Sequence, residues 1–127
     1  MSIDRKRLRW NGWGWIDAPD VLGEDAESIW RWMGRALGID PLPHTPAVPL
    51  EGIDLPPSRL GKNEHGQLAG ILSPERVKTD DYERAFHARG KSYHDLLYLR
   101  AGRLDAAPDA VVYCQTAPEC LDLLRFC

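Results

Sequence analysis

The chain has 127 residues, of which 43% are hydrophobic and 28% are charged, and its net charge is −3 at pH 7. This composition is ordinary for a soluble globular protein, leaves room for one domain at most, and gives no reason to expect nucleic acid or an anionic membrane as a partner. No apolar stretch is long enough to span a bilayer and none resembles a signal peptide, which predicts a cytoplasmic protein.

A basic run and an aromatic segment begin the chain. The basic run consists of Arg5, Lys6, Arg7 and Arg9. It is interpreted as a solvated arm, because a phosphate-binding tail would need more basic residues on a folded face. Residues 9–15 hold three tryptophans separated by glycines. Glycine weakens a strand prediction, so we expect a loop whose indole rings cover a surface outside this chain.

A helix and a proline-rich segment follow. Apolar residues at helical spacing predict a helix that Asp25 caps, that packs through its apolar face and that ends at Gly38. Six of the ten prolines lie between Gly38 and Gly61. Proline excludes a helix or a central strand there, so this segment is expected to wrap across the surface of a larger body. A short helix interrupted by glycines is expected within residues 59–72.

Capping residues predict two further helices in the second half of the chain. Thr79 caps the first, which carries Tyr82 and Phe86 on one face and extends toward Gly90. Ser92 caps the second, which Gly102 closes.

The last segment is predicted to be a strand followed by a helix. Residues 110–114 form a short apolar run suited to a buried strand. Thr116 and Glu119 then form a capping box, with Pro118 in the first helical turn. This order is half of a βαβ crossover whose returning strand is absent, so we expect the strand to lack a partner on both edges. The chain is therefore expected to stop as a new domain begins.

Candidate catalytic and metal-binding residues are few. The best titratable cluster consists of His87, Arg89, His94 and Asp95. Neighbours on a helix point in different directions, so a set of hydrogen bonds on a helix surface explains this cluster better than acid–base catalysis. The cysteines are Cys114, Cys120 and Cys127. They lack the spacing of zinc ligands or of a disulfide framework and are predicted to be reduced thiols, some of them buried.

Three groups of residues resemble FAD-linked oxidases of the p-cresol-methylhydroxylase type. Within that superfamily they are most similar to the alkyldihydroxyacetone-phosphate synthase branch. Residues 10–14 are similar to the N-terminal signature of that branch, and residues 89–102 to the segment that precedes its FAD domain. Residues 108–112 and 121–126 are similar to the first strand and helix of the FAD domain, although Cys114 stands where the family usually has proline.

The resemblance implies an FAD-dependent enzyme that exchanges the acyl group of a dihydroxyacetone phosphate ester for a long-chain alcohol in ether-lipid synthesis. Related oxidases instead oxidise 2-hydroxy acids. In the family, the glycine-rich pyrophosphate loop and the catalytic residues come later in the chain, so no catalytic, cofactor-binding or metal residue is assigned here. The chain alone is expected to bind no FAD and to be inactive, while Arg89 and His94 are candidates to line a substrate approach in the intact enzyme.

The predicted fold is an α+β fragment, mostly helix and proline-rich loop. Residues 1–105 form an N-terminal helical and loop cap segment, and residues 106–127 form the first strand and helix of a truncated FAD-binding domain. The expected partner is the remainder of the FAD-binding enzyme, and a homodimer stays open for the full-length form. The alternative is a free-standing, non-catalytic interaction module that binds a partner through its Trp-rich loop.

Overall fold

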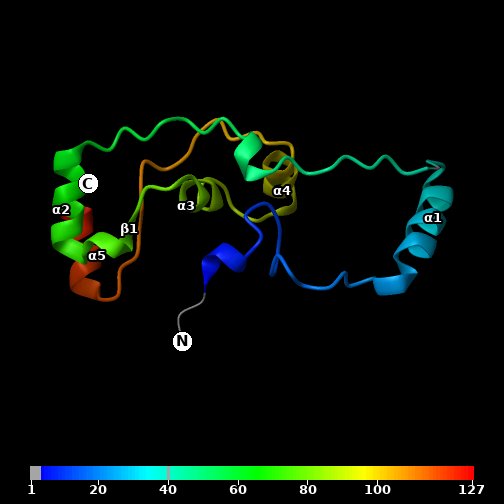
Figure 1. The fold of residues 1–127 in the computed structure, drawn as a ribbon, viewed down its shortest axis with the longest axis horizontal. Helices are drawn as coiled ribbons and strands as arrows, with labels where there is room; N and C mark the ends of the chain where they lie inside the picture. Colours follow the sequence, from blue (N-terminus) through cyan, green and yellow to red (C-terminus); the bar gives the residue numbers. More distant parts are fainter. Residues whose placement is uncertain (1–3, 40) are drawn as a thin grey trace.

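The structure is a computed structural model that describes residues 4–39 and 41–127. It is elongated: α1 lies at one end, α3 and α4 lie in the middle, and α2, β1 and α5 lie together at the other end (Figure 1). Among the described residues, no helix has the length and apolar character needed to cross a bilayer. The helices and strands are α1 (Ala26–Leu37), α2 (Lys62–Leu72), β1 (Val77–Lys78), α3 (Asp81–Phe86), α4 (Tyr93–Arg100), β2 (Val111–Val112) and α5 (Ala117–Phe126). This confirms the predicted α+β class.

Helix α1 is present where the sequence predicted it, but it is not packed as expected. Gly38 closes it with a φ of +70°, a conformation that glycine adopts without strain. The Asp25 side chain makes no capping bond, because a 3₁₀ turn at Gly23–Asp25 leads directly into the helix. Of the α1 residues only Gly34 is buried. The prediction that the apolar face packs on a core within this chain is therefore wrong.

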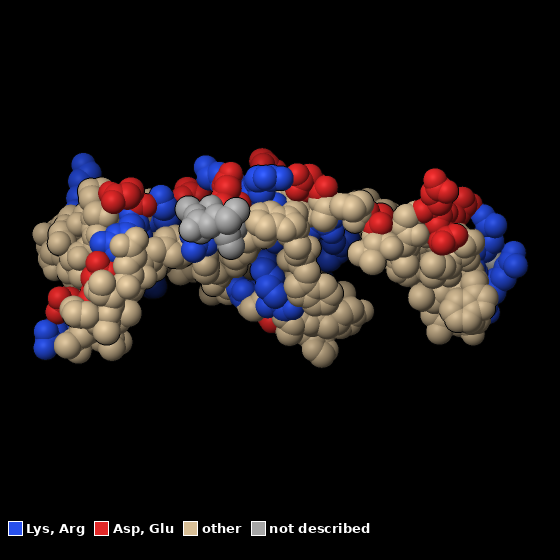
Figure 2. Space-filling view, turned by 90° about the horizontal axis from the view of Figure 1, so that it is seen from below, with Lys and Arg blue, Asp and Glu red and all other residues tan. Residues whose placement is uncertain are grey.

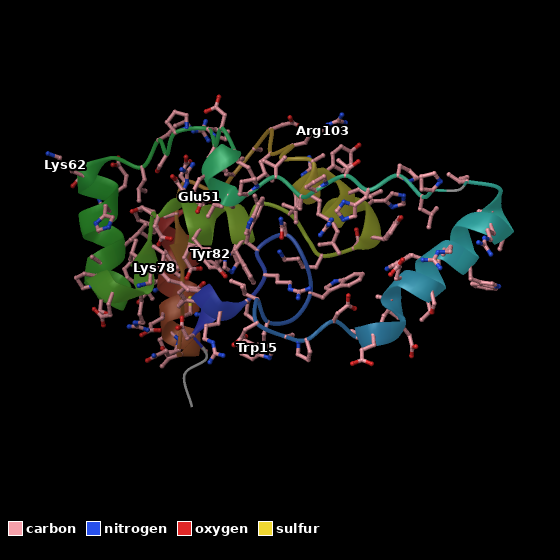
Figure 3. The ribbon with its side chains drawn as sticks, turned by 45° about the vertical axis from the view of Figure 1, so that its right-hand side comes forward. Trp15, Glu51, Lys62, Lys78, Tyr82 and Arg103 are labelled. Atoms are coloured by element: carbon pink, nitrogen blue, oxygen red, sulfur yellow. The ribbon has the colours of Figure 1, made fainter. Side chains whose placement is uncertain are left out.

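The central core forms around α3 and α4. Its buried residues are Trp10, Ala85, Leu96, Leu99 and Leu104. Tyr82 on α3 reaches toward the N-terminal segment, where its hydroxyl lies 2.8 Å from the carbonyl oxygen of Leu8 (Figure 3). The expectation that the Trp-rich loop covers a surface outside the chain is wrong for Trp10, since a large aromatic side chain found core within the chain itself.

A second core joins α2, β1, β2 and α5. Its buried residues are Leu68, Leu72, Val77 and Leu123. The two strands pair antiparallel, with Val77 opposite Val112 and Lys78 opposite Val111. The predicted strand is thus present, but the expectation that both of its edges lack a partner is wrong, because β1 pairs with one of them. Helix α2 begins at Lys62 and runs through Gly66 and Gly70 without interruption.

Local capping chemistry sets the remaining helix starts. Ser92 begins α4 and Thr116 begins α5, each within a complete capping box, as predicted for Thr116. The cap of α3 is Asp80, whose side chain accepts from the backbone N–H of Glu83, and not Thr79. Between α1 and α2 the proline-rich chain is extended and crosses the central body (Figure 1), where the Val48 N–H donates to the Arg100 carbonyl at 2.9 Å.

Candidate functional site

A polar hollow lies between the N-terminal turn and the two-stranded sheet. Its volume is about 680 Å³. The side chains that line it carry both signs of charge, and they come from the N-terminal turn, the β1 region, α3 and the end of β2. The lining residues are Asp4, Arg5, Lys6, Glu75, Arg76, Lys78, Glu83, Tyr113, Cys114 and Gln115. Three of these residues take part in two side-chain pairs, Glu83 with Tyr113 and Arg76 with Glu119, which we call the polar junction.

The first pair of the polar junction is a buried carboxylate and a phenol. Glu83 is 7% exposed, and its Oε2 accepts a hydrogen bond of 2.5 Å from the Tyr113 hydroxyl. Burial, followed by this hydrogen bond to Glu83, raises the pKa of Tyr113 well above its ordinary value. The His87 ring and the Arg5 guanidinium flank the pair, with the Arg5 Cζ 4.0 Å from the centre of the Tyr113 ring. At neutral pH Tyr113 is therefore a fixed donor and is not available as a base.

The second pair ties α5 to the turn before β1. The Arg76 Nη1 and Nη2 atoms each lie 2.9 Å from a Glu119 carboxylate oxygen, which is the forked geometry of a strong ion pair. Glu119 also accepts from the backbone N–H of Gln115 at 2.7 Å. The Arg76 side chain, and next the Gln115 N–H, hold the pKa of Glu119 below its ordinary value. One carboxylate thus serves both the helix cap and the contact between α5 and the sheet.

A buried arginine completes this region from α3. Arg84 is 3% exposed. Its Nε donates to the Pro108 carbonyl at 2.8 Å, its Nη2 donates to the Pro56 carbonyl, and its Nη1 lies 3.6 Å from Asp81. Pro56 and Pro108 have no backbone N–H and therefore cannot donate to one another as residues of paired strands do. The guanidinium therefore joins the proline-rich segment to the chain that leads into β2.

The two predicted substrate-approach residues lie around one ring on α4. The Arg89 Cζ is 4.6 Å from the centre of the Tyr98 ring, and Arg89 Nη2 is 3.6 Å from an Asp105 carboxylate oxygen. His94 and Tyr98 border a hollow of about 270 Å³. Tyr98 thus lies beside each of the two residues. Their role in substrate approach stays a prediction.

The cysteines are free and exposed, which makes the expectation that some are buried wrong. Desolvation, and next the neighbouring Cys120 thiol, raise the pKa of Cys114, so it is a poor nucleophile at neutral pH. In residues 4–39 and 41–127, no group of three or more His, Cys, Asp or Glu side chains is arranged to hold a metal ion.

The N-terminus of α5 does not fit the pyrophosphate of FAD. A helix N-terminus is the usual anion site in such folds, because its first N–H groups are free. At α5 the Glu119 carboxylate already accepts from Gln115 and Thr116, and the Thr116 hydroxyl accepts from the Glu119 N–H. Pyrophosphate would have to displace a carboxylate that Arg76 holds in place.

Sequence reasoning missed Arg76, Glu83, Arg84 and Tyr113. Charged residues at helical positions 83 and 84 are typical of a solvated face. The one available signal was Tyr113, because a tyrosine within a buried apolar run needs a hydrogen-bond partner for its hydroxyl. The sequence does not identify that partner, which lies thirty residues earlier.

Comparison with known proteins places these features in a family context. No family model matches the chain. Protein Rv2250A of Mycobacterium tuberculosis is 31% identical over 83% of this chain and 68% of its own length. Alkyldihydroxyacetonephosphate synthases of Trypanosoma brucei brucei and Dictyostelium discoideum are each 26% identical, over 94% and 84% of this chain. The chain spans 22% and 21% of the length of those two synthases.

A solved structure of an alkyldihydroxyacetonephosphate synthase has the same fold. It superposes with a TM-score of 0.74 over 95% of this chain and 26% of its own, at 24% sequence identity. A second crystal form of such a synthase covers 98% of this chain with the same TM-score. The elongated arrangement of helices and loops in Figure 1 is therefore an arrangement that also occurs within a much longer chain.

Proposed function

The chain belongs to the family of the mycobacterial Protein Rv2250A, and from its likeness to the alkyldihydroxyacetonephosphate synthases we propose that it forms the N-terminal part of an FAD-dependent enzyme of that type. The observation that carries the proposal is the agreement of sequence and fold along nearly the whole chain. Synthase sequences match 94% of it, and a synthase structure matches 95% of it.

The proposed role of this part is to build and hold the first elements of the FAD domain. Residues 1–105 form the cap segment and residues 106–127 the opening strand and helix. The polar junction supports this role, because Arg76 and Glu83 bind β2 and the start of α5 to elements earlier in the chain. FAD belongs to the proposed enzyme, and its pyrophosphate would be held by residues outside this chain. The proposed cellular location is the cytoplasm.

The proposed reaction is alkyl exchange on a dihydroxyacetone phosphate ester, with a long-chain alcohol as the incoming group. Support for the synthase reaction over 2-hydroxy-acid oxidation comes from the matching relatives, which are named as synthases. Arg89 and His94, beside Tyr98, are proposed to border the approach of substrate. The chain alone is expected to be inactive, and the complete enzyme can form a homodimer.

The interaction-module alternative finds no support in the Trp-rich loop. Trp10 is buried, and the Lys91 ammonium donates to its carbonyl oxygen. Trp13 is exposed, but its indole Nε1 donates to the Lys91 carbonyl at 2.9 Å. Trp10 thus belongs to the core and the Trp13 indole is hydrogen-bonded within the chain, while the Trp13 and Trp15 side chains remain exposed.

Capture from the source cell tests the proposal. The tagged chain is expressed at its natural level, isolated under native conditions, and analysed for polypeptides and for FAD released by acid. We expect FAD and an FAD-binding polypeptide to be recovered, together with alkyl-exchange activity. A captured chain that is free of flavin and of any FAD-binding polypeptide would contradict the proposal.

A further inference from the structure

Helix α1 and the chain that follows it form an arm apart from both cores. We call α1, Ile39 and residues 41–44 the arm. Figure 1 shows it at the end of the molecule, joined to the body by extended chain on both sides. The arm is held together locally: the Ile39 N–H donates to the Gly34 carbonyl at 2.8 Å, and Leu42 lies against Gly34. These contacts fix the conformation of the arm, although neither of the two described cores includes any of its residues.

The arm carries an apolar socket. The socket is a hollow of about 520 Å³ whose walls come from α1 on one side and from the following loop on the other. Its lining residues are Trp30, Met33, Ile39, Leu42, Pro43 and His44. Trp30 remains 50% exposed and Ile39 49%. In the space-filling view the side of the arm away from its acidic residues is almost free of charge (Figure 2).

Exposed apolar area of this kind is costly unless something covers it. We propose that the socket receives a bulky apolar side chain from the part of the synthase fold that this chain does not span. The inference rests on the proposed function. A synthase structure matches 98% of this chain, so nearly all of the arm belongs to the shared fold, yet the chain covers only 26% of that structure. The larger remainder is a body on which such an arm can rest.

The charges and shape of the arm favour this occupant over a lipid surface. The start of α1 is acidic, with Glu24, Asp25 and Glu27, and Glu27 pairs with Arg31. An anionic bilayer surface would repel these carboxylates. A concave socket is also filled better by a protruding side chain than by a flat lipid surface.

The same shape argues against a second copy of this chain. A two-fold dimer whose axis passes through the socket would place two sockets opposite one another. Two concave walls facing each other leave both hollows unfilled, which forfeits the contacts that make an interface stable. A protruding apolar residue on a different surface is required, and the rest of the synthase fold is the proposed source.

Two tryptophans on α1 allow a matched test. Trp30 lines the socket, whereas Trp32 is 67% exposed and outside the socket lining. Residues two apart on a helix point in nearly opposite directions. Replacing either with Glu in the tagged full chain changes the same residue type in the same helix, so their effects on helix formation are comparable. Circular dichroism of each variant checks that α1 still forms.

The readout is the FAD-binding polypeptide captured per tagged chain. We expect Trp30→Glu to reduce capture about tenfold or more, as for a central interface anchor. We expect Trp32→Glu to stay within about twofold of the unchanged chain, as for a peripheral position. Met33→Ala, a milder change in the socket wall, is expected to give an intermediate loss.

The outcomes separate this inference from the proposed function. Equal capture by Trp30→Glu and the unchanged chain would overturn the socket while leaving the proposed function intact. Absence of any FAD-binding polypeptide from the unchanged chain would contradict the proposed function, and the inference with it. Two other results would also overturn the socket: a dimer of this chain that Trp30→Glu dissociates, measured by light scattering, or binding to anionic phosphatidylserine vesicles that Trp30→Glu abolishes.

Discussion

Replacing Arg84 with Met tests whether one buried guanidinium holds the proline-rich segment to the strand region. The Met side chain keeps the apolar stem but removes the donors to the Pro56 and Pro108 carbonyl oxygens. Pro56 and Pro108 are half-buried. The loss of a partner therefore costs each carbonyl at most about 1–3 kcal/mol, and the two together at most about 2–6 kcal/mol. Part of this is offset because a charged group no longer has to be dehydrated. We expect a net loss of about 3 kcal/mol in the free energy of unfolding.

Urea unfolding followed by tryptophan fluorescence measures this loss, because Trp10 lies in the central core. With a slope of about 1.5 kcal/mol per molar urea, the midpoint should fall by about 2 M. The matched control is Arg125→Met, since the Arg125 side chain is 69% exposed and pairs with Asp122 at 3.1 Å. A surface pair of this kind contributes about 0–1 kcal/mol. Equal midpoints for the two variants would refute the reasoning that Arg84 joins the segments.

Three further changes test the polar junction and the arm. Tyr113→Phe removes the donor to buried Glu83 and should lower the free energy of unfolding by about 1.5–3 kcal/mol. Folding raises the pKa of Tyr113, so the unchanged chain should lose stability as the pH rises above 10.0, where unfolded tyrosine ionises. The Phe variant should lose less, and an equal dependence of the unfolding free energy on pH in the two proteins, measured by urea titration, would contradict this. Folding lowers the pKa of Glu119, so stability should fall as the pH drops below 4.5. Glu119→Gln should make the unfolding free energy less dependent on pH in this range, and an unchanged dependence would show that this carboxylate does not cause it. A Cβ on Gly34 would lie 2.7 Å from the Ile39 carbonyl oxygen, so Gly34→Ala should speed hydrogen exchange in the arm, and slowed exchange would refute the close packing. The control is Gly66→Ala in α2, where a Cβ meets nothing within 4 Å and should stabilise the helix by about 0.5–1 kcal/mol.

Helix positions followed from the sequence because local chemistry determines them. Gly38 closes α1, and Ser92 and Thr116 begin α4 and α5, through bonds that span at most a few residues. A hydroxyl or a glycine acts on its own turn of backbone, so its effect can be deduced without knowing the fold. The error at Asp25 shows the limit, since a preceding 3₁₀ turn left its side chain without a capping role.

Long-range pairing did not follow from the sequence for a different reason. Strand β1 is only Val77–Lys78, too short to show an alternating pattern. Its partner β2 lies more than thirty residues away, so nothing local indicates the match. Trp10 and Trp13 illustrate the same limit: they share one glycine-rich loop, yet one is buried in the central core and the other is largely exposed.

Helix α3 explains how two small cores become one molecule. Its apolar residues, among them Ala85, pack into the central core. Its charged residues Glu83 and Arg84 bind on either side of β2, Arg84 to the Pro108 carbonyl before the strand and Glu83 to Tyr113 after it. These bonds cross the proposed boundary between residues 1–105 and 106–127. The second core crosses the same boundary, since Leu68, Leu72 and Val77 share it with Leu123, so the bonds of α3 add polar contacts to an apolar one. If the boundary is real, Tyr113→Phe and Arg84→Met should weaken the same contact. Their combined effect on unfolding should then be smaller than the sum of the two, as for residues that share one interaction. Strict additivity would mean that α3 makes two independent contacts.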